Sequence, residues 1–277
     1  MLLQRVLTAL LLAPLVIAVV AFAPTAVVAI VAAIAFLAAL WEWAALSGLR
    51  SHVGRGALLL VMALAFVVLW ELRNTPVGIW VVVTGLAWWV AVCFWLRHFA
   101  YAAAPTRENL AFKLVAGLLV TLPAWTALVM IHAHRPYGQW WTLLALFIVW
   151  AADIGAYFSG RTFGKRKLAP QVSPGKTWAG AYGALIAGVI VMAVGGWFLH
   201  VRGVALVALL LLAVITVSVS IIGDLLESLM KRHAKVKDSG TLFPGHGGLL
   251  DRLDSVFAAL PVLAAGLWLL ACVKAIP

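Results

Sequence analysis

Long runs of apolar residues, separated by short polar segments, dominate this chain of 277 residues. A helix needs about 20 apolar residues to cross the hydrocarbon core of a bilayer. No run shows the short polar and apolar alternation that is typical of a barrel strand. Because lipid offers no hydrogen-bond partners to the backbone, runs of this length predict helices. The expected spans are residues 6–22, 25–47, 57–71, 77–96, 114–131, 140–159, 177–199, 203–223 and 256–273.

Composition supports this interpretation. The chain is 65% hydrophobic and only 10% charged, and its mean hydropathy is +1.10, whereas soluble domains carry about 25% charged residues. We therefore expect an all-α, polytopic integral membrane protein with about nine transmembrane helices. The break after the first span rests on Pro24, and the third run is short, so eight or ten spans stay open. Without a convincing cleavage site the first run is expected to be a retained span, and residues 1–277 are expected to form one membrane-embedded domain.

Basic residues orient the predicted spans. The net charge of +11 lies mainly in loops that flank spans, which indicates topology and anionic lipid or phosphate ligands rather than nucleic acid. Sixteen of the twenty Lys and Arg fall on one side of a nine-span arrangement, and the other four are Arg73, Arg135, Arg202 and Lys274. Because positive loops stay inside, the N-terminus is expected in the cytoplasm and the C-terminus outside.

Charged residues are concentrated between the last two predicted spans. The segment from Asp224 to Asp254 holds ten of the chain's 29 charged side chains, 20 of which are Lys or Arg and nine Asp or Glu. On a helix that continues from the eighth span, Asp224, Glu227 and Lys231 would share one face, because residues three or four apart are neighbours. Asp251 and Asp254 repeat this spacing where the ninth span starts. The segment thus predicts two acidic helix ends joined by a basic loop.

The acids of this segment permit two interpretations. Carboxylates that converge repel one another unless a cation compensates them, and Mg²⁺ suits such ligands together with substrate phosphates. Alternatively, the acids complement a helix dipole and the bases form a solvated patch near lipid. The four bases between residues 231 and 237 favour the first interpretation, because a polyphosphate requires both metal and bases. His246, which lies between glycines, fits an acid–base role and a loop contact equally well.

A second polar cluster follows the sixth predicted span. Asp153 lies near the inner end of that span, and an acid at membrane depth is a functional candidate that needs a partner. Ser173 and Pro174 precede the seventh span in the order of a helix N-cap and first turn, a start that favours anions. Lys176 would add positive charge there, although simple helix capping explains the same residues. For Glu42, a further buried acid in the second span, we expect a polar contact inside the bundle rather than catalysis.

Both polar segments resemble signatures of a known enzyme family. One runs from Ser228 through Lys231-Arg232, Lys237-Asp238-Ser239-Gly240 and Phe243-Pro244-Gly245-His246-Gly247-Gly248 to Asp251-Arg252-Leu253-Asp254. Over its whole length this segment is similar to the signature of the CDP-diacylglycerol synthase (phosphatidate cytidylyltransferase) family. The other motif region, residues 153–179, also resembles the family, but Ala179 stands where many members carry an acid. We therefore expect no catalytic role at that position. With residues 224–255, the two regions cover about sixty residues.

The resemblance implies an activity, a cofactor and substrates. The phosphate of phosphatidic acid would attack the α-phosphorus of CTP and form CDP-diacylglycerol and pyrophosphate, with Mg²⁺ as cofactor. A second cation and a homodimer are suggested by the resemblance alone. It also implies a bacterial inner (cytoplasmic) membrane protein, surrounded by membrane lipids, whose site faces the cytoplasm and its CTP. Because phosphatidate is already ionised near neutral pH, a dedicated general base need not exist.

Residue roles are carried over from the matching motif positions. The expected metal ligands are Asp224, Asp251, Glu227 and Asp254. The residues expected to bind substrate are Asp153, Ser173, Lys176, Ser228, Lys231 and Arg232. The residues expected to take part in catalysis are Asp224, Asp251, Lys237, His246 and Arg252.

Three other functions compete with this one. A secondary transporter of an anionic metabolite also uses buried acids and broken helices, but here the charges lie in one loop and no paired repeat is visible. A CDP-alcohol phosphotransferase would carry a DG-x2-AR block, which is absent. A cytidylyltransferase that acts on another lipid phosphate stays open.

Overall fold

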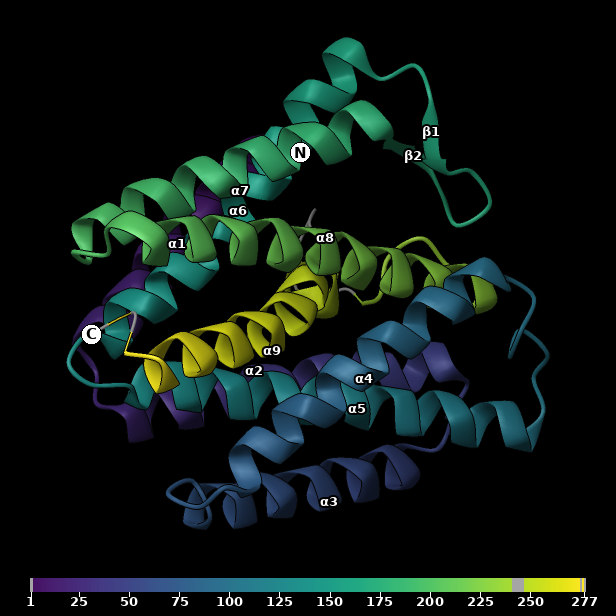
Figure 1. Ribbon diagram of the computed structural model, residues 1–277. Coiled ribbons are helices and arrows are strands. Elements are labelled where there is room, and N and C mark those ends of the chain that lie inside the picture. Colours follow the sequence, from purple (N-terminus) through teal and green to yellow (C-terminus); the bar gives the residue numbers. More distant parts are fainter. Residues whose placement is uncertain (1, 241–246, 275, 277) are drawn as a thin grey trace.

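The computed structural model describes residues 2–240, 247–274 and 276. In this part of the chain, helices account for nearly all regular structure, beside one two-stranded hairpin (Figure 1). The helices are α1 (Leu2–Phe22), α2 (Thr25–Ser47), α3 (His52–Glu71), α4 (Val77–Arg97), α5 (Arg107–Ala133), α6 (Gly138–Phe163), α7 (Trp178–Phe198), α8 (Gly203–His233) and α9 (Leu250–Cys272). The strands are β1 (Lys167–Ala169) and β2 (Ser173–Thr177). The predicted all-α membrane fold is confirmed.

The described residues form nine helices, which is the number of spans expected. Eight of the described helices are long and apolar enough to cross a membrane, and α1 adds a shorter apolar stretch, Leu12–Phe22. Several helices extend beyond the predicted spans at their polar ends. For example, α5 begins at Arg107, where the hydroxyl of Thr106 caps it by accepting from the amide of Asn109 at 3.2 Å. Hydropathy detects only the part of a helix that lipid surrounds, whereas capping residues decide where the helix starts.

Helix α9 forms the centre of the bundle. It packs against α2, α4, α5, α6 and α8 (Figure 1). Helix α3 lies at the edge, and Met62 and Phe66 are its buried residues. The N-terminal end of α9 therefore meets several other helices in the interior of the bundle, although it is itself polar.

Helices α6 and α7 approach closely because small residues separate them. A Cβ atom on Gly155 would lie 2.5 Å from the carbonyl oxygen of Gly183 and 2.8 Å from the Cβ of Ala187. Such close contacts between small residues are typical of helix pairs in membranes. This pair holds the β1–β2 hairpin, which joins the two helices at one end of the bundle (Figure 1).

The hairpin corrects the expected N-cap of the seventh helix, although the span itself agrees with the expected residues 177–199. Ser173 is not an N-cap, because it lies in β2 and pairs with Ala169 of β1. A residue before proline favours extended backbone, so Pro174 places Ser173 in a strand rather than at a helix start. The helix begins at Trp178, and Thr177 is its N-cap, whose hydroxyl accepts from the amide of Gly180 at 3.1 Å. Ser173 therefore offers no helix N-terminus to an anion, and its expected contact with a substrate phosphate stays a prediction.

Candidate functional site

Helix α8 carries the first two carboxylates of the site. It continues to His233 as the spacing predicted, so Asp224 and Glu227 lie one turn apart near its end. Its last turn contains Lys231, Arg232 and His233, and cations there complement the negative end of the helix dipole. The two acids therefore stand where the helix leaves its long apolar stretch.

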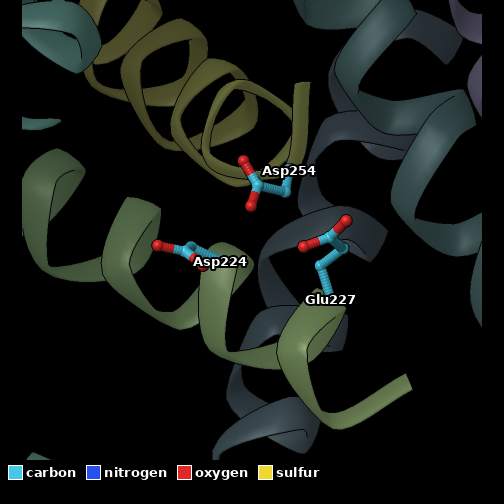
Figure 2. Close-up of side chains that lie close together, drawn as sticks. All are labelled: Asp224, Glu227 and Asp254. Atoms are coloured by element: carbon cyan, nitrogen blue, oxygen red, sulfur yellow. The ribbon is translucent and has the colours of Figure 1, made fainter. Parts of the chain in front are cut away.

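Helix α9 brings a third carboxylate to the first two. It contacts α8 closely at Gly223, where an added Cβ would lie 2.5 Å from the carbonyl oxygen of Asp254. Asp224, Glu227 and Asp254 each offer a carboxylate oxygen, and these atoms lie within 4.8 Å of one another. Figure 2 shows the three side chains close together, with Asp224 and Glu227 on α8 and Asp254 on α9. The predicted convergence of acids from two helices is confirmed, and we refer to these three residues as the acidic triad.

The acidic triad fits a hard divalent cation. Glu227 is only 2% exposed, and its Oε1 atom is buried without a hydrogen-bond partner in the part of the chain that the structure describes. A buried acceptor of this kind is costly unless something binds it. Oxygen ligands from a few carboxylates are also what Mg²⁺ takes in proteins. The burial, the unsatisfied oxygen and the mutual distances therefore all suit a cation between the two helices.

Two lysines balance part of this negative charge. Lys176 of β2 forms an ion pair with Asp224. Lys231 forms ion pairs with Glu227 on its own helix and with Asp251, the latter at 2.6 Å. Both described anionic contacts of Lys231 are thus carboxylates of the protein itself. Its expected contact with a substrate phosphate stays a prediction.

Asp251 lies outside the acidic triad. Its Oδ1 accepts from Lys231, and its Oδ2 accepts from the amides of Ser239 and Gly248, at 3.0 and 2.8 Å, and from the Ser239 hydroxyl at 2.8 Å. These contacts tie the first turn of α9 to the preceding loop. Asp254, one helical turn deeper, is the acid of α9 that faces α8. The two acids of α9 thus have different surroundings, and the expected metal-ligand role of Asp251 stays a prediction.

A cavity of about 370 Å³ opens beside the acidic triad. Lys176 and Asp224 line it together with Asp153, Tyr157 and Arg161 of α6. The Nη1 atom of Arg161 donates to the Tyr157 hydroxyl at 2.9 Å. The cavity therefore combines two acids, a lysine and an arginine with small apolar wall residues, which are Ala152, Ala156, Ala181 and Ala184. Such a lining suits a phosphate that is joined to apolar groups.

From the sequence, Arg161 is only one of the sixteen basic residues that orient the predicted spans. Its place in the cavity follows from the four-residue spacing to Tyr157, which puts both side chains on one face of α6. That spacing was visible in the sequence. What was not visible is that this face turns toward α8, so that Asp153 lines the same cavity as Asp224.

The remaining predicted residues fall into three groups. Arg232 is exposed, and its Nε donates to the carbonyl oxygen of Val172 at 3.2 Å, which ties α8 to the hairpin. Ser228 lies on the same helix and is half-buried, while Lys237, in the loop before α9, and Arg252, in the first turn of α9, are exposed. His246 lies outside the described residues.

Comparisons with known proteins show the family of this chain. A model described as the cytidylyltransferase family matches residues 3–270. A Pseudomonas aeruginosa protein named phosphatidate cytidylyltransferase is 44% identical over 272 residues, 97% of each chain. A Haemophilus influenzae protein of that name is 36% identical over 283 residues, 94% of this chain and 96% of its own. One from Brucella suis is 45% identical over 157 residues, 53% of this chain and 54% of its own. Because the family model and two of these relatives span nearly the whole chain, this protein belongs to the cytidylyltransferase family.

Proposed function

We propose that this protein is a phosphatidate cytidylyltransferase. An oxygen of the phosphatidate phosphate attacks the α-phosphorus of CTP and forms a new P–O bond. The bond from the α-phosphorus to the oxygen that bridges it to the β-phosphate breaks, and pyrophosphate leaves with that electron pair. The observation that carries the proposal is the acidic triad beside a cavity that contains Lys176 and Arg161. The full-length relatives bear the same activity in their names, which favours it over the transporter.

The acidic triad is proposed to hold the metal. Asp224, Glu227 and Asp254 would bind a Mg²⁺ ion, which supplies charge neutralisation for the CTP polyphosphate when bound. The two helices hold these carboxylates in place before substrate arrives, so little reorganisation is needed during the reaction. Within the triad, the Glu227 side chain is held in place by its ion pair with Lys231.

Cationic side chains of the cavity are proposed to orient the two phosphates. Lys176 already lies against Asp224, at the border between cavity and acidic triad. Arg161 approaches from α6, where its hydrogen bond with Tyr157 limits its movement. Holding two polyanions at reacting distance requires such compensation, and positioning provides much of the rate in phosphoryl-type transfers. Exposed Lys237 and Arg252 are candidates for shielding the pyrophosphate as it leaves.

The cavity is also proposed to admit the lipid headgroup from the side. Tyr157 and Phe158 of α6 and Tyr182 of α7 are exposed, and Tyr157 also lines the cavity. Acyl chains would lie along these side chains while the phosphate enters beside Lys176. By the distribution of bases, this end of the bundle faces the cytoplasm, from which CTP arrives. A bacterial inner membrane fits the bacterial relatives.

Labelled CTP tests the activity directly. Purified protein in detergent is incubated with phosphatidate, Mg²⁺ and CTP labelled at either the α- or the γ-phosphate. We expect labelled lipid from the α-label only, because the β- and γ-phosphates leave as pyrophosphate. Glu71→Gln serves as the control variant, since Glu71 is an exposed acid at the end of α3, and it should match the wild type.

The same assay tests whether a lipid phosphate other than phosphatidate is the true acceptor. Other lipid phosphates, offered singly and in competition, would give labelled lipid with higher kcat/KM than phosphatidate if one of them were the true acceptor. Absence of labelled lipid from every acceptor, with a protein that is folded by its melting curve, contradicts the proposal.

A further inference from the structure

Glu42 is a buried acid that the proposed reaction does not use. It lies near the end of α2 and is 8% exposed. A carboxylate in such surroundings is costly unless charged or hydrogen-bonding partners compensate it. Among the described residues, no lysine or arginine forms an ion pair with it. Its compensation therefore comes from neutral donors.

Those donors belong to the start of α9. The amide of Leu249 donates to Glu42 Oε1 at 3.0 Å, and the amide of Leu250 donates to Oε2 at 2.8 Å. Helix α9 has no capping side chain of its own at Leu249, although the first amides of any helix need acceptors. Glu42 supplies these acceptors from a distant part of the chain, and its negative charge also suits the helix dipole.

Ser239 links Glu42 to Asp251. Its hydroxyl oxygen lies 2.8 Å from Glu42 Oε2 and 2.8 Å from Asp251 Oδ2. A hydroxyl has one hydrogen, so Ser239 donates to one carboxylate at a time and is shared between them. Both acids thus contact the hydroxyl of Ser239, and both accept from backbone amides at the start of α9.

Two glycines let the backbone close around the Glu42 carboxylate. A Cβ on Gly240 would lie 2.7 Å from Glu42 Cδ, and one on Gly248 would lie 2.6 Å from the same atom. Any side chain at either position would displace the carboxylate. This requirement accounts for small residues at these two places in the loop.

We propose that Glu42 is a positioning residue for the acidic triad. It fixes where α9 begins, and Asp254 lies one turn after Leu250 on that helix. The start of α9 is thus held by α2 through Glu42, while the turn that carries Asp254 meets α8 at Gly223. The inference rests on the proposed cation site, because its consequence is the distance between Asp254 and the two acids of α8.

Binding of Mn²⁺ alone tests the inference without turnover. Purified full-length variants are titrated with Mn²⁺, and the free ion is followed by electron paramagnetic resonance. In Glu42→Gln, an amide NH₂ replaces one acceptor and faces a backbone N–H. We expect the Kd for Mn²⁺ to rise by about 10- to 100-fold, the usual effect of losing a partner that orients metal ligands. Glu42→Asp, which keeps the charge on a shorter side chain, should give an intermediate Kd.

Ser47→Ala is the matched control. Ser47 is on the same helix, 7% exposed, and its hydroxyl donates within α2 to the Trp43 carbonyl oxygen at 2.8 Å. Its Kd should equal that of the wild type. Ser239→Ala, which removes one donor to Glu42, should raise the Kd less than Glu42→Gln does.

The outcomes separate this inference from the proposed function. If Glu42→Gln lowers the melting temperature but leaves the Kd unchanged, Glu42 only stabilises the fold and the inference is wrong. If Glu42→Gln does not fold, Ser239→Ala decides, since an unchanged Kd there also overturns the inference. Asp254→Asn should abolish Mn²⁺ binding. If it binds like the wild type, the cation site itself is wrong, whatever Glu42 does.

Discussion

Acids close together in the sequence have different surroundings in this protein. Asp254 points into a group of carboxylates, while Asp251 accepts from two amides, a hydroxyl and a lysine. An acid surrounded by donors stabilises its neighbourhood, whereas an acid surrounded by acids is held there at a cost. Residues that are kept at such a cost are candidates for function. At this scale, local partners rather than residue type distinguish the two acids.

Substituting each acid by its amide tests this division. We expect Asp254→Asn to lower turnover by about three orders of magnitude, or about 4 kcal/mol of transition-state stabilisation, without loss of stability, because carboxylate repulsion is relieved. Asp251→Asn should instead destabilise the fold by about 3–5 kcal/mol, because Lys231 loses a buried partner and an NH₂ faces backbone donors. The initial rate of labelled-lipid formation measures turnover, and denaturation of the purified protein in detergent measures stability. An Asp251→Asn protein of full stability that no longer binds Mn²⁺ would make Asp251 a ligand.

The contact between α8 and α9 decides whether the triad can form at all. Two helices bring their backbones this close only where a residue lacks a side chain, and Gly223 provides that position. Farther along α8, the last turn reaches two other segments, since Arg232 donates to the hairpin and His233 contacts the Phe99 carbonyl oxygen at 2.7 Å. One helix thus aligns the hairpin, α9 and the α4–α5 connection.

Gly223→Ala tests the closeness of these helices. The new Cβ would lie 2.5 Å from the Asp254 carbonyl oxygen and 2.8 Å from Ala258, so α9 must shift. We expect weaker Mn²⁺ binding, slower turnover and a loss of about 1–3 kcal/mol in stability, as for overpacking in cores. Gly56→Ala on α3 is the control, because nothing lies within 4 Å of its added Cβ. Alanine there should stabilise the helix by up to about 1 kcal/mol, and equal effects of the two variants would contradict the argument.

At the scale of the whole molecule, the helix ends that carry the site lie at one end of the bundle. The acidic triad, the cavity and the hairpin lie where α6 and α8 end and α7 and α9 begin. The basic residues that predict a cytoplasmic side are concentrated in the same connections. An odd number of spans would then place the C-terminus on the opposite side from the N-terminus.

Labelling of single cysteines tests this orientation. In a protein whose Cys93 and Cys272 are replaced by serine, a cysteine is introduced at Lys235 or at Lys274, both of which are exposed. An impermeant maleimide should label position 235 only in inverted vesicles and position 274 only in right-side-out vesicles. Labelling of both positions from the same side would rule out nine spans, and the reverse pattern would invert the topology.

Much of the fold was predictable because lipid restricts what a backbone can do. A long apolar run in a bilayer must satisfy its own hydrogen bonds, so hydropathy located the helices from α2 to α9. The spacing of Asp224 and Glu227 likewise predicted one face of one helix, since that relation is local. The family followed from motif residues alone and is confirmed.

Relations between distant segments could not be predicted in this way. The sequence assigned Ser173 to a helix start, but pairing with β1 made it part of a strand. Glu42 was recognised as a buried acid, yet its partners lie more than 190 residues away in the chain. Which acid of α9 faces α8 depends on the rotation of one helix against another, and that rotation is set by packing at Gly223 and by the contacts of Glu42. Local periodicity contains no information on that rotation, so the apolar pattern predicted the helices and the packed bundle determined the site.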